Sequence, residues 1–237
     1  MRGVILAGGK GTRLGLLTVQ TNKHLVPVYD KQMILYPLET FKGMGITEIL
    51  IVSGKDHYGK FVEFLGSGKD FGADFTYRVQ DDAGGIAEAL GLAKDYLKNE
   101  ENFAVILGDN IFENVPSPII KQGKKAKIFL KEVEDAFRFG VVDFSDNEIF
   151  AIKEKPKNVK RGYAVTGLYI YPTEVFDIIE NLEPSDRGEL EITDVNSWYV
   201  RRGLMDHEML PGFWSDAGTP DSLAESTQWL INKRKSQ

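Results

Sequence analysis

Several residue types and patterns are missing from this chain, and each absence excludes a class of protein. None of its 237 residues is cysteine, which excludes disulfide bonds, thiolate catalysis and cysteine-ligated metal sites. The apolar runs are short and interrupted by charge, so the sequence predicts no transmembrane helix. Because a core strand begins within the first residues, we expect no signal peptide and a cytoplasmic location. No serine or threonine lies in a nucleophile-elbow pattern, so we expect no covalent intermediate.

A positive net charge is also missing. The formal net charge is −6, which argues against nucleic-acid binding because that function needs a basic face. An anionic substrate would therefore be held by a local basic pocket and not by the field of the whole molecule. With 42% hydrophobic residues, the chain is expected to form one compact domain.

Apolar runs alternate with amphipathic stretches through the first half of the chain, which is typical of a parallel sheet flanked by helices. The strands expected there are Gly3–Leu6, Glu48–Val52, Phe75–Arg78 and Phe103–Leu107. The helices expected there are Met33–Lys42, Tyr58–Leu65 and Gly85–Lys98. In such sheets, ligands bind beyond the carboxyl ends of the strands.

From Ala126 onward the chain is richer in strands. The strands expected in this part are Lys127–Val133, Gly140–Phe144, Ile149–Lys153 and Val165–Tyr171. Helices are expected to return at Thr173–Asn181, Thr193–Arg202 and Asp221–Arg234.

The most informative segment is the glycine-rich loop after the first strand, Gly8-Gly9-Lys10-Gly11-Thr12-Arg13. Glycines let the backbone approach a ligand, and successive N–H groups in such a turn form a nest for anions. Arg13 and Lys23 add positive charge, which suits a polyphosphate, and we expect neither side chain to be buried in the core. The spacing matches neither the P-loop nor the dinucleotide fingerprint. An ordinary strand-to-helix turn with a solvated arginine is the alternative.

Two aspartates follow apolar or aromatic segments. Asp109 comes after an apolar strand, and Asp216 lies in the run Trp214–Thr219. One or two carboxylates together with phosphate oxygens commonly hold Mg²⁺. Each aspartate could instead cap a turn or a helix.

Two further segments could hold the remaining parts of a substrate. Glu154 and Lys155 end a strand before Pro156, so the carboxylate could accept bonds from sugar hydroxyls while the lysine meets a phosphate. Gln80 ends another strand ahead of Gly84-Gly85, and its amide could pair with the edge of a base. A charged surface and a simple helix entry are the alternatives.

Taken together and in order, these segments resemble the sugar-phosphate nucleotidylyltransferases, and among them the thymidylyl branch. The motifs that carry the resemblance include Leu6–Leu14, Lys23–Lys31, Gly84–Ala87, Leu107–Phe112, Phe139–Val142, Glu154–Pro156, Ala164–Tyr169, Arg187–Asp194 and Trp214–Asp216. The resemblance implies an α/β fold of Rossmann-like type. Its sheet is mixed but mainly parallel and flanked by helices, with a strand-rich sugar-binding part. It implies one domain in three parts: a nucleotide-binding half (1–125), a sugar-phosphate-binding half (126–220) and a C-terminal helix (221–237).

The resemblance also implies a reaction: Mg²⁺-dependent transfer of a thymidylyl group from dTTP to α-D-glucose 1-phosphate, giving dTDP-glucose and pyrophosphate. Arg13 would grip the departing pyrophosphate, Lys23 would neutralise charge on the transferring phosphorus, and Asp109 and Asp216 would bind Mg²⁺. The implied nucleotide-binding residues are Leu6, Ala7, Gly8, Gly9, Gly11, Thr12, Arg13, Gln80, Gly85 and Asp109. The implied sugar-phosphate-binding residues are Asn110, Gly140, Glu154, Lys155 and Val165.

The sequence departs from the family pattern at some positions. These are Leu16, Asn22, Gln32, Phe139, Ser215 and Ala217. The chain also resembles a short form without a longer C-terminal extension. Two alternatives stay open: an enzyme that uses UTP or another hexose 1-phosphate, and a sugar-nucleotide-binding regulator without turnover. By analogy with the family, we expect a homotetramer or dimer and neither a nucleic-acid nor a membrane partner.

Overall fold

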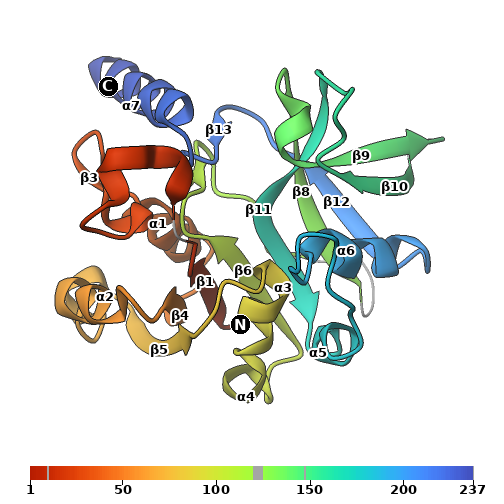
Figure 1. Cartoon of the computed structure of the whole chain (residues 1–237), viewed down its shortest axis with the longest axis horizontal. Helices are drawn as coiled ribbons and strands as arrows, with labels where there is room; N and C mark the ends of the chain where they lie inside the picture. The colour runs from red at the N-terminus through yellow and green to blue at the C-terminus, as the bar shows by residue number, and fades with distance from the viewer. Residues whose placement is uncertain (10, 120–124, 147, 237) are drawn as a thin grey trace. The chain divides into compact units, whose positions relative to one another are not determined.

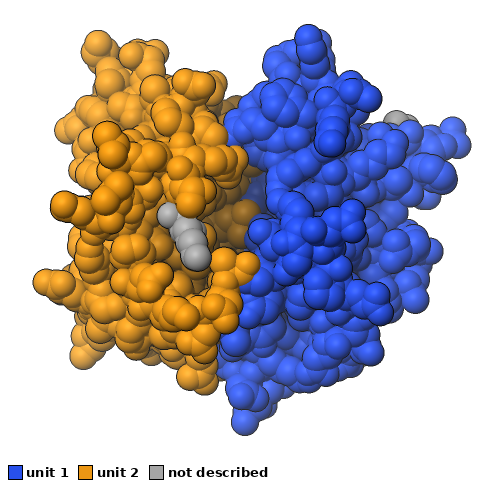
Figure 2. All heavy atoms as spheres, in the orientation of Figure 1, with its two compact units in different colours: residues 1, 84–105, 116–211 blue, residues 2–83, 106–115, 212–237 orange. Residues whose placement is uncertain are grey.

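The computed structural model describes residues 1–9, 11–119, 125–146 and 148–236, so Lys10 of the glycine-rich loop lies outside the described residues. The chain divides into two compact units, coloured separately in Figure 2. Unit 1 contains Met1, Gly84–Val105 and Pro116–Pro211, and unit 2 contains Arg2–Ala83, Ile106–Val115 and Gly212–Gln237. The functional division into residues 1–125, 126–220 and 221–237 stays a prediction.

Unit 2 is built on parallel strands. Strand β4 (Glu48–Gly54) lies between β1 (Gly3–Ala7) and β5 (Asp74–Gln80) and is parallel to both. On the other side of β1 lies β6 (Asn102–Leu107), of which the last two residues belong to this unit. Strand β1 is apolar and buried throughout, as expected of a strand buried on both faces.

Helices and short elements complete unit 2 (Figure 1). The helices are α1 (Leu35–Gly43), α2 (Tyr58–Leu65) and α7 (Pro220–Lys235). Segments of 3₁₀ helix occur at η1 (Thr12–Thr18), which is kinked at Gly15, and as single turns at η2 (Lys23–Leu25) and η3 (Lys69–Phe71). Two-residue strands form two antiparallel pairs, β2 (Pro27–Val28) with β3 (Lys31–Gln32), and β7 (Ile111–Phe112) with β13 (Trp214–Ser215).

Unit 1 is rich in antiparallel strands, in the order β10-β9-β11-β6, and β8 also pairs with β11. Its strands, besides the start of β6, are β8 (Ala126–Val133), β9 (Gly140–Ser145), β10 (Glu148–Glu154), β11 (Gly162–Pro172) and β12 (Met205–Met209). Its helices are α3 (Ile86–Gly91), α4 (Lys94–Leu97), η4 (Ala136–Arg138), α5 (Val175–Ile179) and α6 (Ile192–Val200) (Figure 1).

The expected α/β fold, with a mixed sheet flanked by helices and a strand-rich part, is confirmed. Two expectations need correction. The helix expected over Gly85–Lys98 is interrupted between Gly91 and Lys94, where a glycine of low helix propensity ends the first segment. Strand β12 was not expected, because its sequence Met-Asp-His-Glu-Met carries no strand pattern. No helix among the described residues is long and apolar enough to cross a membrane.

Candidate active site

The small β7–β13 ladder determines where the two predicted metal-binding aspartates lie. Asp109 lies two residues before the start of the first strand, and Asp216 follows directly after the second. Ser215 pairs with Ile111 in the antiparallel register. The start of one strand therefore lies beside the end of the other, and both aspartates lie at the same end of the ladder in unit 2.

Asp109 is buried, and both of its carboxylate oxygens have protein partners. The Lys23 ammonium donates to Oδ2 at 2.5 Å, and the amide of Asn110 donates to Oδ1 at 2.9 Å. Burial acts to raise the pKa of Asp109, but the charge and hydrogen bond of Lys23 outweigh it and hold this pKa below its usual value. The group is therefore a carboxylate at neutral pH.

The glycine-rich loop leaves room for Lys23. Gly11 has a left-handed φ of 67°, and a Cβ added there would lie 2.7 Å from the Cβ of Lys23. A Cβ at Gly9 would lie 3.3 Å from Cε of the same lysine. The Lys23 side chain is 13% exposed and the residue as a whole is half-buried, so it is less open to solvent than we expected. It is drawn inward by its ion pair with Asp109.

Arg13, in contrast, is exposed, as expected, and its side chain lies in the same part of unit 2 as Lys23 and Asp109. A Cβ added to Gly218 would lie 3.3 Å from both Nη2 of Arg13 and Oδ2 of Asp109. Gly218 therefore lies close to both groups. Two cations, one buried carboxylate and the glycine-rich loop meet in unit 2, an arrangement that suits a polyphosphate with a metal ion.

The other predicted nucleotide-binding residues of unit 2 lie around this loop. Leu6 and Ala7 are the last, buried residues of β1, and exposed Thr12 begins η1. Gln80 is buried at the end of β5, and any side chain at Gly8 would overlap its amide oxygen. Gly8 thus has a packing reason to be glycine.

The residue after Lys23 is a neutral histidine, His24, which is held by Asn22. The ring of His24 lies 2.6 Å through Nδ1 from Oδ1 of Asn22, and the same oxygen accepts the backbone N–H of His24 at 2.9 Å. The amide of Asn22 donates to the carbonyl of Ala7 at 3.3 Å. Burial, with the nearby Lys23 charge, lowers the pKa of His24 to about 3. This frame joins the end of β1 to η2.

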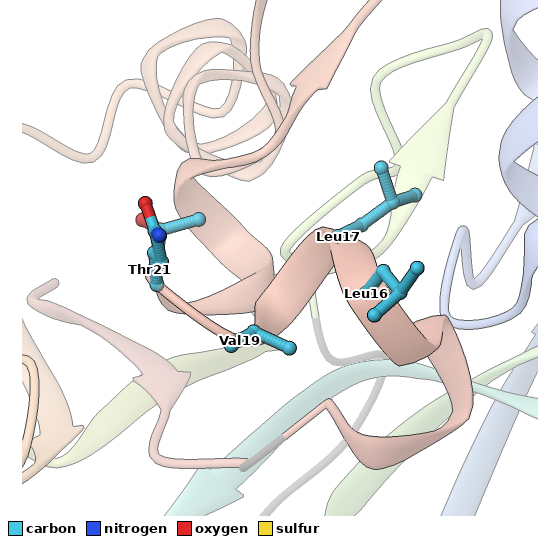
Figure 3. Close-up of a pocket in the computed structure, with 5 residues that line it drawn as sticks. Leu16, Leu17, Val19 and Thr21 are labelled. Atoms are coloured by element: carbon cyan, nitrogen blue, oxygen red, sulfur yellow. The ribbon is translucent and has the colours of Figure 1, made fainter.

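A pocket of unit 2 lies on the segment that follows the loop (Figure 3). Its lining residues are Leu16, Leu17, Val19, Gln20 and Thr21. Leu16 and Val19 are 92% and 70% exposed. None of the predicted site residues lines this pocket.

A second cluster of predicted residues lies in unit 1, around the end of β10. Glu154 pairs in register with Gly140 of β9, and its Oε2 accepts the hydroxyl of Thr193 at 2.5 Å. Lys155 adopts a left-handed φ of 43°, and its ammonium lies 3.1 Å from Oε1 of Glu154. Arg187 lies 3.6 Å from the same oxygen. Two cations thus flank one carboxylate, which can accept bonds from hydroxyl groups while the cations bind a phosphate.

Two glycines near this cluster lie close to neighbouring groups, and at Gly85 the backbone requires glycine. A Cβ at Gly140 would lie 3.1 Å from the Thr193 hydroxyl. Gly85 has a φ of 106°, and a Cβ there would lie 2.5 Å from the carbonyl oxygen of Leu190. Val165 is buried on β11, one residue beyond Ala164, which pairs with β9.

The structure therefore separates the predicted residues into two groups. Gly85, Gly140, Glu154, Lys155 and Val165 belong to unit 1, and the rest belong to unit 2, including Asn110, which contacts Asp109. No group of three or more histidine, aspartate or glutamate residues in the described part of the chain could hold a metal. The proposed metal would therefore depend on substrate oxygens as further ligands.

Three residues in these clusters were not predicted as site residues. Thr193 and Arg187 contact Glu154, and Trp214 donates to Asn110. Arg187 and Trp214 lie in motifs that carry the family resemblance, so their position in those motifs was the available signal. Thr193 lies in the same motif as Arg187, so the same signal was available for it.

The sequence profile described as nucleotidyl transferase matches residues 2–233 of the chain. A glucose-1-phosphate thymidylyltransferase from Neisseria meningitidis is 40% identical over 97% of this chain and 82% of its own length. The same figures hold for the enzyme of that name from Mycolicibacterium smegmatis.

Two solved structures are also similar. A Bacillus anthracis protein, provisionally assigned as a glucose-1-phosphate thymidylyltransferase and solved with sucrose, is 49% identical with a TM-score of 0.91. The alignment covers 97% of this chain and 94% of that one. A UDP-glucose pyrophosphorylase in complex with UDP-glucose has a TM-score of 0.82, covers 98% of each chain and is 24% identical. At that identity the likeness concerns the fold alone.

Proposed function

Because the chain belongs to the nucleotidyl transferase family, we propose that it transfers a thymidylyl group from dTTP to α-D-glucose 1-phosphate, giving dTDP-glucose and pyrophosphate. Transfer of a nucleotidyl group to a sugar phosphate is the coarser activity that its relatives establish. The choice of thymidylyl and of glucose is supported by the names of relatives that are 40% to 49% identical.

The observation that carries the proposal is the meeting of Arg13, Lys23 and Asp109 beside the glycine-rich loop. An oxygen of the sugar phosphate forms a bond to the α-phosphorus, and the bond from that phosphorus to the bridging oxygen breaks. The bridging oxygen leaves with the electron pair as part of pyrophosphate. Lys23 would stabilise charge on the transferring group, and Arg13 charge on the leaving group.

Asp109 and Asp216 would hold Mg²⁺. The donor set fits, because Asp109 is ionised and a carboxylate has about four lone-pair sites, of which Lys23 and Asn110 use two. Two carboxylates with substrate phosphates are a common way to hold Mg²⁺. When bound, the ion would neutralise phosphate charge.

The sugar phosphate is assigned to unit 1. Glu154 would accept hydrogen bonds from sugar hydroxyls, and Lys155 would bind the phosphate. Arg187 adds a second cation within 3.6 Å of Glu154, and Gly140 leaves room where a side chain would meet Thr193 and Glu154. The base is assigned to Gln80, whose amide offers one donor and one acceptor side by side.

The release of pyrophosphate on mixing glucose 1-phosphate with each nucleoside triphosphate tests this proposal. We expect dTTP to be used best and UTP less well, because one methyl group is worth about 10- to 200-fold. CTP, ATP and GTP should be far weaker, because a site that binds a polar edge rejects bases lacking it by about 10⁴-fold or more. If ATP or GTP matched dTTP, the thymidylyl assignment would be wrong. If no triphosphate gave pyrophosphate with glucose 1-phosphate, the chain would either use another hexose 1-phosphate or bind sugar nucleotides without turnover.

The metal has its own test. EDTA should abolish activity and added Mg²⁺ should restore it. Asp109→Asn and Asp216→Asn should each raise the Mg²⁺ concentration needed for half-maximal activity, because each replaces a charged oxygen ligand with a neutral one. Activity that persists unchanged in EDTA would remove both residues from a metal site.

A further inference from the structure

We propose that Trp214 is a positioning residue for nucleotidyl transfer, acting through Asn110 on Asp109. The indole Nε1 donates to Oδ1 of Asn110 at 2.8 Å, and Nδ2 of Asn110 donates to Oδ1 of Asp109 at 2.9 Å. All three residues are at most 8% exposed and belong to unit 2. This inference rests on the proposed function, in which Asp109 holds the metal of the nucleotide.

The chemistry of the two end groups leaves Asn110 only one orientation. An indole N–H can only donate, so the atom of Asn110 that meets Trp214 must be the carbonyl oxygen. An ionised carboxylate can only accept, so the atom that meets Asp109 must be the amide nitrogen. A flipped amide would lose both hydrogen bonds and place like groups in contact. Trp214 therefore determines which face of the amide is presented to Asp109.

The strand that carries Trp214 also leads to the second aspartate. Trp214 pairs with Phe112 in the β7–β13 ladder, and Asp216 follows that ladder directly. The indole hydrogen bond therefore adds a side-chain link between the segment of Asp216 and the segment of Asp109. Polar groups that hold a metal ligand in place typically contribute 10- to 100-fold to metal affinity or activity.

The test compares Trp214→Phe, Asn110→Ala and the double variant with the wild type. Phenylalanine keeps an aromatic ring on β13 and removes the N–H. Trp229→Phe is the matched control, because Trp229 stacks on Phe213 with ring centroids 4.4 Å apart and has no part in this chain of hydrogen bonds. The readout is the binding of Mn²⁺ to the enzyme–dTTP complex with no sugar phosphate present, measured as the change in the Mn²⁺ EPR signal relative to the same Mn²⁺ and dTTP without enzyme.

We expect Trp214→Phe to weaken Mn²⁺ binding about 10-fold or more, and Trp229→Phe to leave it unchanged. Because the indole acts through Asn110, the double variant should bind Mn²⁺ no more weakly than Asn110→Ala alone. Wild-type binding by Trp214→Phe, or losses that multiply in the double variant, would overturn the inference while leaving the proposed function intact. A wild type that does not bind Mn²⁺ with dTTP would instead overturn the role of Asp109, and this inference with it.

A second measurement covers the case in which Trp214→Phe does not fold. In the wild type, the ¹H–¹⁵N signal of the Trp214 indole should shift when Mg²⁺ and dTTP are added, because hydrogen bonds in a chain polarise one another. The signal of Trp229 should stay in place. A Trp214 signal that does not move at saturating nucleotide would contradict the inference.

Discussion

The Lys23–Asp109 ion pair places two opposite charges in a buried position before any substrate arrives. Each group keeps binding capacity, because an ammonium has three donors and a carboxylate about four acceptor sites, and the pair uses one of each. Neither charge could be buried alone at low cost. The pair therefore allows the Lys23 ammonium to bind a phosphate while the Asp109 carboxylate beside it binds a cation.

Arg13→Ala and Lys23→Ala should lower the rate alike and differ in stability. Each removes an electrostatic stabiliser of the phosphates, which typically costs about 10²–10³ in kcat. Arg13 is exposed, so its loss should leave the melting temperature unchanged. Lys23→Ala should lower the free energy of unfolding by about 3–5 kcal/mol, because it leaves the Asp109 charge buried and unpaired.

Pyrophosphate-release kinetics and urea unfolding measure the two effects. Arg161→Ala is the control, since this exposed arginine pairs only with Glu132 and Glu134 among the ion pairs of the described residues. Equal free energies of unfolding for Lys23→Ala and the wild type would show that the pair is not buried in solution.

His24 should make the protein less stable as the pH falls. Its pKa is lowered to about 3 in the folded chain and is about 6.5 when unfolded. Below pH 6.5 the unfolded state therefore binds more protons, and stability falls as the pH drops from about 6.5 to about 3, by up to about 1.4 kcal/mol per unit. The Asp109 pKa is lowered below 3.8, so the contribution of that group is lost only in stronger acid.

Urea unfolding at pH 7.5 and pH 5.5 checks this prediction. The wild type should lose about 1.4 kcal/mol between the two values, and His24→Gln should lose much less. If His24→Gln lost as much free energy of unfolding between the two pH values as the wild type, the pH dependence would come from other groups.

At the scale of elements, long periodic segments were predictable and two-residue strands were not. Helix α2 spans Tyr58–Leu65, the predicted bounds, because its apolar positions repeat at helical spacing. Strands β7 and β13 lie about 100 residues apart in the chain and carry no pattern of their own. Their pairing depends on tertiary packing, yet this ladder brings Asp109 and Asp216 to one end.

Helix α7 begins directly after the turn that follows Asp216, and its first residues form a capping box. The Thr219 hydroxyl accepts the backbone N–H of Ser222 at 3.2 Å, and the Ser222 hydroxyl accepts that of Thr219 at 3.1 Å. Thr219→Ala should therefore lower the free energy of unfolding by about 1 kcal/mol.

Thr227→Ala is the matched control within α7. The Thr227 hydroxyl bonds only the carbonyl of Leu223 within the helix, and alanine has the higher helix propensity, so this variant should be neutral or slightly stabilising. Urea unfolding of both variants measures the difference. If Thr219→Ala proved as stable as Thr227→Ala, the capping box would not contribute to the free energy of unfolding.

At the scale of the whole molecule, local clusters compensate for the net charge of −6. Cations lie beside the glycine-rich loop in unit 2 and beside Glu154 in unit 1, as required if both substrates are anionic. The sequence predicted most members of both clusters because each follows a strand end or a glycine turn. It could not predict that Lys23 and Asp109 pair across 86 positions, or that Trp214 reaches Asn110, since such contacts depend on the folded chain.

If each unit holds one substrate, variants should separate the two binding steps. Glu154→Gln keeps the shape of the side chain and its bond to Thr193 but removes the charge that would accept sugar hydroxyls. We expect kcat/KM for glucose 1-phosphate to fall about 10- to 100-fold, the usual effect of losing a hydrogen bond to a charged group. The affinity for Mg²⁺ and dTTP, measured by calorimetry without sugar phosphate, should not change.

Gln80→Ala should weaken nucleotide binding in the same calorimetric measurement, because it removes the amide assigned to the base. If Glu154→Gln weakened dTTP binding as much as Gln80→Ala does, the assignment of one substrate to each unit would fail, even with the overall reaction intact.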